Sequence, residues 1–279
     1  MDIIDHLQKV LPQLSEKQQA VAGVLLDDSY RASFMTIREL ADAAGVSTTT
    51  VLRLVQSLGF DQFKDMCRAF HESALAAPPL QKLREGKMAE SFIDPFFLQQ
   101  VISHEQQSLS AFLTPFLHSN FTRAVKFLAS ADKVRVIGAR SAFSLAYYLG
   151  FLLQQFMGNV TFASPNTDNI YEQLGLLGES DAVVIFAFPR YSKSTIRVCR
   201  FLHEHAVPVI AVTDGPLSPL IKYSACSLFC RNTSPFYSYT AAMSLCNGII
   251  LALKEILGNT FDERLKKMGD ILQEEGIYF

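Results

Sequence analysis

Hydrophobic positions between Ile3 and His71 recur with the period of short amphipathic helices, and no segment there has the strict alternation of a strand. The apolar stripe from Ala20 to Leu25 follows Ser15 and Gln18, whose spacing is that of a capping box at a helix start. The first part of the chain is therefore predicted to be all-α.

Two further capping signals predict a pair of helices separated by a tight turn. Thr36 and Glu39 repeat the capping-box spacing, and Ser47 is placed to cap a helix from Thr48 to Ser57. Gly45, between the two helices, permits the positive φ that such a turn often needs. The pattern predicts a helix-turn-helix, which reads DNA with its second helix, although a plain helical hairpin has the same pattern.

The pattern changes after residue 76. The run Ala76-Ala-Pro-Pro79 cannot continue a helix, and a mixed charged stretch follows it. We expect a helix-turn-helix domain over residues 1–77, a linker over residues 78–95 and a second domain over residues 96–279.

The second part alternates helical segments with short β-branched runs. Helical patterns cover residues 97–112 and 120–130, and the runs typical of strands are 133–138, 181–186 and 208–213, with another candidate at 224–231. Each run is followed by a turn and a helical segment, as in βαβ units. The predicted fold class is an all-α helix-turn-helix domain followed by an α/β domain with a central parallel sheet flanked by helices.

Three loops of the second domain are candidates for a ligand site. Ligands of open α/β sheets bind at the carboxyl ends of the strands, here at residues 138–144, 188–195 and 214–219. Hydroxyls and helix N-terminal amides bind anions, and arginine adds a planar two-pronged donor. We expect an effector site made by Arg140, Ser141, Arg190, Tyr191, Ser192, Ser194 and Thr195.

Two alternatives stay open at these loops. Either Ser192 or Ser194 can cap the following helix. Arg190 can pair with Asp168, with Glu172 or with a carboxylate of a partner subunit, which would leave no ligand site.

Composition indicates a folded, soluble chain: 49% of its residues are hydrophobic and 19% are charged, with a net charge of −2. The first ten residues lack the apolar core of a signal peptide, and no later apolar run approaches the roughly 20 residues of a membrane span. We expect a cytoplasmic protein that does not bind membranes. Five scattered cysteines fit reduced thiols, and the one close pair, Cys226 and Cys230, lacks the further ligands of a zinc site.

Charge alone does not favour DNA binding, since residues 1–77 hold seven Lys+Arg against ten Asp+Glu, a net of −3. Helix-turn-helix geometry can work with a small local basic patch. Short polar side chains near the start of the second helix can reach base edges, and nearby cations can meet phosphates. The expected DNA-binding residues are Arg38, Ser47, Thr48, Thr49, Thr50, Arg53, Gln56 and Lys64.

The sequence does not place the side chains of a catalytic site in the same loops. The ligand loops hold Ser, Thr, Arg and Tyr, and the nearest carboxylates by position are Asp168, Glu172 and Asp214. His203 and His205 fall late in a predicted helix, where a cation suits the helix dipole. We expect no catalytic residue, no metal and no cofactor, and thus a protein that is not an enzyme.

At these residues the chain resembles the RpiR/MurR family of bacterial transcriptional regulators, which join an N-terminal helix-turn-helix to a C-terminal sugar-isomerase (SIS) domain. In the first domain the resemblance rests on residues 14–16, 35–41, 44–47, 50–54 and 58–60. In the second it rests on residues 136–141, on the strand ending at Phe188, and on residues 210–214 and 218–220.

One motif departs from that family. The usual SIS phosphate loop, Ser-x-Ser-Gly-x-Thr, is replaced by Ala187-Phe-Pro-Arg-Tyr-Ser192. Only Ser192 keeps a hydroxyl, at the position of the Thr, while Ser141 is the firmer match. The resemblance offers no matching acid/base residue.

Together these features predict a DNA-binding transcriptional regulator whose SIS domain senses a small anionic metabolite, such as a sugar phosphate, and controls operator binding. Because one short recognition helix binds weakly, we expect a homodimer or homotetramer on a palindromic operator. The rivals are a phosphosugar isomerase of SIS type and a metabolite-binding module with a protein-interaction domain.

Overall fold

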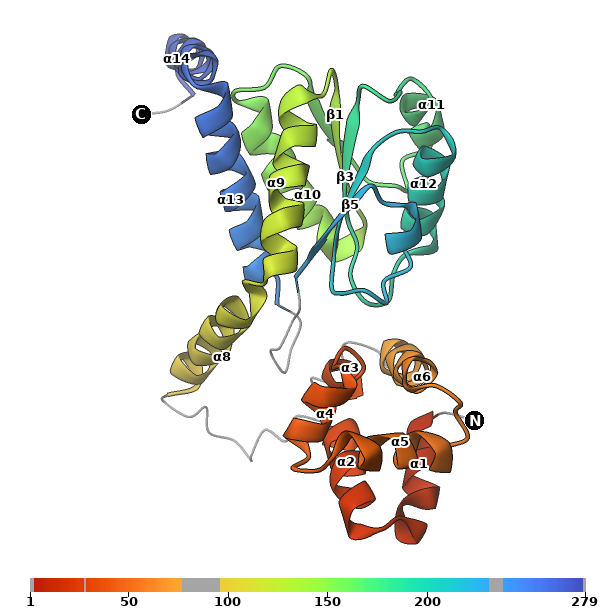
Figure 1. Ribbon diagram of the computed structural model, residues 1–279. Coiled ribbons are helices and arrows are strands. Elements are labelled where there is room, and N and C mark those ends of the chain that lie inside the picture. The colour runs from red at the N-terminus through yellow and green to blue at the C-terminus, as the bar shows by residue number, and fades with distance from the viewer. Residues whose placement is uncertain (1–2, 28, 77–95, 231–237, 278–279) are drawn as a thin grey trace. The chain divides into compact units, whose positions relative to one another are not determined.

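The computed structural model describes residues 3–27, 29–76, 96–230 and 238–277 (Figure 1). The chain folds into two compact units, Met1–Phe92 and Ile93–Phe279. The linker predicted over residues 78–95 lies outside the described residues and stays a prediction.

The first unit is helical throughout its described part, as predicted. Its hydrophobic core contains fully buried side chains, among them Leu7, Leu25, Leu54 and Phe70. Its elements are α1 (Ile3–Val10), the 3-10 turn η1 (Leu11–Gln13), α2 (Glu16–Asp27), α3 (Ser29–Ala32), α4 (Ile37–Ala43), α5 (Thr48–Ser57) and α6 (Phe63–Ala76).

The second unit alternates strands and helices around one sheet. It begins with α8 (Phe97–Phe112) and α9 (Pro115–Ser130), and it ends with α13 (Thr240–Leu257) and α14 (Asn259–Glu274). Between them lie β1 (Val134–Gly138), η2 (Arg140–Ala142), α10 (Phe143–Gln154), β2 (Val160–Ala163), α11 (Ile170–Leu174), β3 (Ala182–Phe186), α12 (Lys193–Glu204), β4 (Val209–Thr213), η3 (Ile221–Tyr223) and β5 (Cys226–Phe229).

All five strands are parallel, in the order β2-β1-β3-β4-β5. Val134 of β1 pairs with Val160 of β2 on one side and with Ala182 of β3 on the other. The direction in which successive strands are added therefore reverses after β2. Strand β2 lies on one side of β1, and β3, β4 and β5 follow one another on the other side. The crevice between the carboxyl ends of β1 and β3 is the topological switch point, where open α/β sheets bind ligands.

Helices cover both faces of this sheet (Figure 1). Strand residues alternate between two cores: Val184 and Val212 pack with α9, α10 and α13, while Ile185 and Ala211 pack with α11 and α12. Because both faces are buried, β3 and β4 are buried at every position. This explains why those strands read as continuous apolar runs.

The sequence predicted β1, β3 and β4 to within one residue, and β5 falls inside the predicted run 224–231, of which residue 231 is not described. It missed β2, a four-residue edge strand that is mostly half-buried. It also placed α9 five residues too late: Thr114 caps that helix by accepting from the Leu117 amide at 3.1 Å, and Pro115 occupies its first turn.

Among the described helices, α13 is long and apolar enough to cross a membrane by length and composition. Core helices of soluble proteins meet the same criterion. Six of its residues, including Cys246, Ile249 and Leu253, are buried against α9, α10 and the sheet.

Candidate functional site

The helix pair α4–α5 has the predicted helix-turn-helix geometry. Thr36 and Glu39 form a full capping box at the start of α4, with side-chain to backbone distances of 3.2 and 2.7 Å. Gly45 has a φ of +64°, and the Val46 amide then bonds back to the Ala41 carbonyl at 2.9 Å. This turn fixes the direction in which α5 leaves α4.

One face of α5 is buried and the opposite face is open. Val51, Leu54 and Val55 lie in the core of the first unit. The exposed residues include four that the sequence predicted to face outward: Thr48, Thr49, Arg53 and Gln56. The outer face of α5 is therefore mainly polar, with one cation, and it also exposes the apolar side chain of Leu52, which is 46% exposed.

Two predicted DNA contacts have partners within their own helix. Ser47 caps α5 by accepting from the Thr50 amide at 3.4 Å, and the two hydroxyls lie 3.1 Å apart. Their role in DNA binding stays a prediction. Arg38 and Lys64, the two predicted phosphate contacts outside α5, are both exposed.

In the second unit, the loop after β1 turns sharply into a 3-10 helix. A Cβ at Gly138 would lie 2.4 Å from the Ala142 carbonyl oxygen, so only glycine permits this close approach. Arg140, two residues later, has a φ of +55° and an exposed side chain. The Ser141 hydroxyl lies 2.9 Å from the Tyr239 hydroxyl, which ties this loop to the start of α13.

The loop after β3 contains a second arginine in the left-handed region. Arg190 has a φ of +64° and is exposed. A non-glycine residue costs roughly 1 to 3 kcal/mol in such a conformation, and strain of this kind clusters at functional sites. Within the described residues neither Arg140 nor Arg190 has an ion pair, so the alternative pairing of Arg190 with Asp168 or Glu172 is not seen there.

Tyr191, the next residue, points inward. Its hydroxyl donates to the carboxylate of Asp214, which is 1% exposed, and Thr213 and Ser218 complete a buried polar cluster. Burial, and then the negative charge of Asp214, raise the pKa of Tyr191 far above its usual value. The Tyr191 hydroxyl therefore stays protonated and donates to Asp214, and its side chain packs beneath the loop.

The hydroxyls that follow differ in their access to solvent. Ser192 stands at the N-cap of α12, but its side chain makes no capping bond and instead lies 2.6 Å from the Ser194 hydroxyl. Capping thus does not account for Ser192. Thr195 is 1% exposed, so its hydroxyl lies beneath the surface of the site. The role of these residues in ligand binding stays a prediction.

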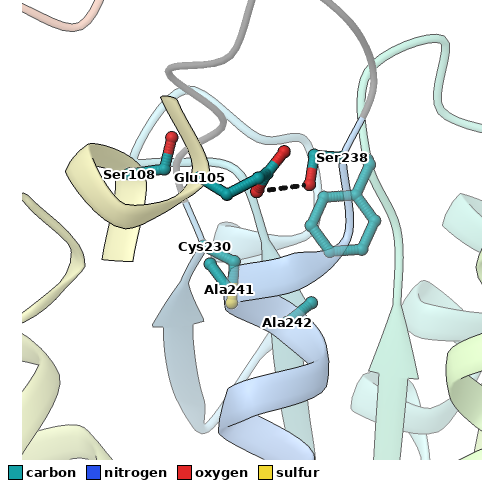
Figure 2. Close-up of a pocket in the computed structure, with 7 residues that line it drawn as sticks. Glu105, Ser108, Cys230, Ser238, Ala241 and Ala242 are labelled. Atoms are coloured by element: carbon teal, nitrogen blue, oxygen red, sulfur yellow. Dashed lines mark hydrogen bonds between the residues drawn. The ribbon is translucent and has the colours of Figure 1, made fainter. Parts of the chain in front are cut away.

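A small pocket beside these loops involves residues that the sequence analysis missed. It has a volume of about 10 Å³, room for about one water molecule. Figure 2 shows Glu105 of α8 reaching Ser238 ahead of α13, and the Ser238 hydroxyl donates to Glu105 at 2.8 Å. Phe188 and Cys230, at the ends of β3 and β5, complete the lining with Ser108, Ala241 and Ala242. No sequence signal links Glu105 to Ser238, because 133 positions separate them.

Groups for other chemistry are sparse in the described part of the chain. It contains no cluster of three His, Cys, Asp or Glu side chains able to hold a metal. All five cysteines are free and buried, and burial raises the pKa of Cys67, Cys199 and Cys246 to about 12. His203 lies in the last turn of α12 and His205 is its C-cap residue, and both are exposed.

Comparison with known proteins matches both units. Residues 1–76 match the helix-turn-helix domain of the rpiR family, and residues 127–252 match the SIS domain. The Escherichia coli HTH-type transcriptional regulator HexR is 22% identical over 286 residues, which cover 98% of this chain and 95% of HexR.

Solved structures show the same fold. The Vibrio vulnificus NanR protein complexed with ManNAc-6P superposes with a TM-score of 0.60 at 17% identity, covering 98% of both chains. The sugar isomerase domain of an RpiR transcription factor from Sphaerobacter thermophilus gives 0.58 at 20% identity, covering 64% of this chain and 99% of that one.

Proposed function

Because this chain belongs to the regulators that join an rpiR-family helix-turn-helix to a SIS domain, we propose that it controls transcription by coupling operator binding to a small anionic effector. The observation that carries the DNA part is the face of α5. Thr48, Thr49, Arg53 and Gln56 are exposed together there, while the buried residues Val51, Leu54 and Val55 of the same helix anchor it. Hydroxyl, amide and guanidinium groups are those that read base edges in the major groove.

The effector part rests on the switch point of the sheet. Arg140 follows β1 and Arg190 follows β3, the two neighbouring strands between which the strand order reverses. Both guanidiniums are exposed, and both residues hold strained backbones without an ion pair to a described carboxylate. A pair of guanidiniums at this place favours a phosphate or carboxylate ligand.

The first amides of α12 add to this anion site. Ser192 leaves them without a side-chain cap, and a helix N-terminus favours negative charge. The complex of NanR with ManNAc-6P supports a sugar phosphate as the first class of ligand to test. Sugar acids satisfy the same guanidinium chemistry.

A phosphosugar isomerase is the rival function, since the SIS fold also occurs in putative isomerases. Isomerisation needs an acid/base group placed at the ligand. Glu105 is the carboxylate that lines the pocket, and it is hydrogen-bonded to Ser238. We propose that the chain has no such activity and that it acts in the cytoplasm as a homodimer or homotetramer on a palindromic operator.

A selection from random duplex DNA tests this proposal, run with the full chain and with pools of sugar phosphates and sugar acids. The proposal predicts an enriched palindrome with half-sites about 34–36 Å apart, and an enrichment that changes when one pool is present. Turnover of any of the same sugar phosphates without DNA enrichment would establish the isomerase instead.

A further inference from the structure

Among the side chains that the structure describes in the first unit, one large apolar residue is exposed. This residue is Leu52 of α5, which is 46% exposed. It belongs neither to the hydrophobic core of the unit nor to the half-buried apolar side chains packed against that core. Leu54 and Val55, close by in the same helix, are buried. The packing of the unit therefore does not account for a leucine at position 52.

Leu52 lies among the polar side chains on the outer face of α5. It follows Thr48 by four residues and Thr49 by three, and it precedes Gln56 by four. Residues at these intervals are neighbours on the surface of a helix. Because all four side chains are exposed, Leu52 is continuous with the face that we propose to read base edges.

A different flank of α5 is covered by α2. The side-chain amide of Gln18 in α2 donates to the hydroxyl of Ser57 in α5 at 3.1 Å. Ser57 follows Leu52 by five residues, which places it roughly 140° further around the helix. Leu52 is therefore on the side of α5 that α2 leaves open.

The major groove of DNA offers a leucine one distinctive apolar group. Thymine presents its 5-methyl group there beside an acceptor oxygen, whereas adenine, guanine and cytosine are distinguished by their hydrogen-bonding groups. Contact between a methyl group and a leucine side chain removes apolar surface of both from water, which is favourable. Helix-turn-helix proteins contact base edges with the N-terminal residues of the second helix, and Leu52 is the fifth residue of α5.

We propose that Leu52 is a specificity-determining residue, which selects a thymine in each half-site of the operator by contact with its 5-methyl group. The hydroxyl, amide and guanidinium groups around it can exchange hydrogen bonds with base edges, and Leu52 adds a contact of a different chemical kind. This inference rests on the proposed DNA binding by α5, and it adds the identity of one base in each half-site.

Replacement of single thymines by deoxyuridine tests the contact, because deoxyuridine keeps the hydrogen-bonding edge of thymine and lacks only the methyl group. Fluorescence anisotropy would be measured with the full chain and the operator obtained by selection. We expect one thymine in each half-site whose replacement weakens wild-type binding about fourfold, the effect of burying one methyl group. Leu52→Ala should bind the two duplexes with equal affinity. Its fold should be intact, because the position is exposed and alanine favours helices.

Two further variants serve as matched controls. Leu52→Met keeps an apolar side chain of similar volume and should still distinguish thymine from deoxyuridine. Leu176→Ala, at a position in the second unit that is 73% exposed, should behave like the wild type.

The outcomes separate this inference from the proposed function. Equal wild-type affinity for every substituted duplex would overturn the role of Leu52 while leaving DNA binding by the chain established. A deoxyuridine effect that persists in Leu52→Ala would also overturn it, because another residue would then contact the methyl group. Failure to select any duplex would overturn the proposed function and this inference together.

Discussion

The Tyr191 hydroxyl donates a hydrogen bond to the buried carboxylate of Asp214. This bond joins the loop after β3 to the end of β4 and turns the aromatic ring under the loop. The preceding residue, Arg190, is left exposed with a positive φ. One buried bond therefore holds the loop in the conformation that presents the cation.

Removing that hydroxyl should destabilise the SIS unit. Tyr191→Phe takes one donor from a buried carboxylate, a loss that typically costs about 1 to 3 kcal/mol. Urea unfolding followed by circular dichroism would measure it in the full chain. Tyr171→Phe, on the exposed side of α11, is the control and should change the free energy of unfolding little.

Replacing Arg190 with glycine should stabilise the protein and abolish its response to the effector. Arg190→Gly relieves the positive φ, so we expect unfolding to become about 1 kcal/mol more costly while the effector response is lost. Thermal unfolding and operator titration with the anion would measure the two effects. A variant that is less stable, or that keeps the response, would remove the argument from strain.

The outer face of α5 should determine DNA sequence preference. Arg53→Ala and Thr49→Ala are each expected to cost about 1 to 3 kcal/mol on the selected operator, with the fold intact. Lys64→Ala should weaken all duplexes alike and reduce the dependence of binding on salt. Fluorescence anisotropy on specific and random duplexes separates the two classes, with Arg200→Ala of α12 as the control. Normal operator binding by all three variants would mean that another face contacts DNA.

The buried thiols should react slowly in the native protein. With pKa values of about 12, Cys67, Cys199 and Cys246 hold little thiolate at pH 8, and alkylation should be roughly a thousandfold slower than for a free thiol. Because folding raises these pKa values, the folded state is favoured while the thiols are protonated. This contribution to the free energy of unfolding is complete below about pH 8.5 and is lost as the pH rises towards 12. Rapid labelling of native protein at pH 8, resolved by mass spectrometry, would contradict this.

Local chemistry made much of the fold predictable. Capping side chains act within one turn, so Thr36 and Ser47 located α4 and α5 directly, and Gly45 located the turn. The β-branched runs of β3 and β4 are buried on both faces, which distinguishes a doubly covered parallel sheet from an exposed one. The edge strand β2 is short and half-buried, so its pattern carried too little signal.

Long-range contacts were beyond the sequence. Arg140 and Arg190 could be assigned to loops at one edge of the sheet, but their positive φ values belong to backbones that only the folded loops define. The inward turn of Tyr191 depends on Asp214, 23 residues away, and the bond from Ser238 to Glu105 joins segments 133 residues apart. Such pairs are fixed by tertiary packing, which single-sequence patterns do not encode.

Operator affinity measured against effector concentration tests the central claim most directly. Fluorescence anisotropy of the selected duplex with the full chain should show at least a tenfold change in Kd when the active sugar phosphate or sugar acid is added. Arg190→Lys should bind the duplex like the wild type yet lose that change, because a point charge does not reproduce the planar fork. An unchanged Kd with every anion tested, or a full response in Arg190→Lys, would contradict the account.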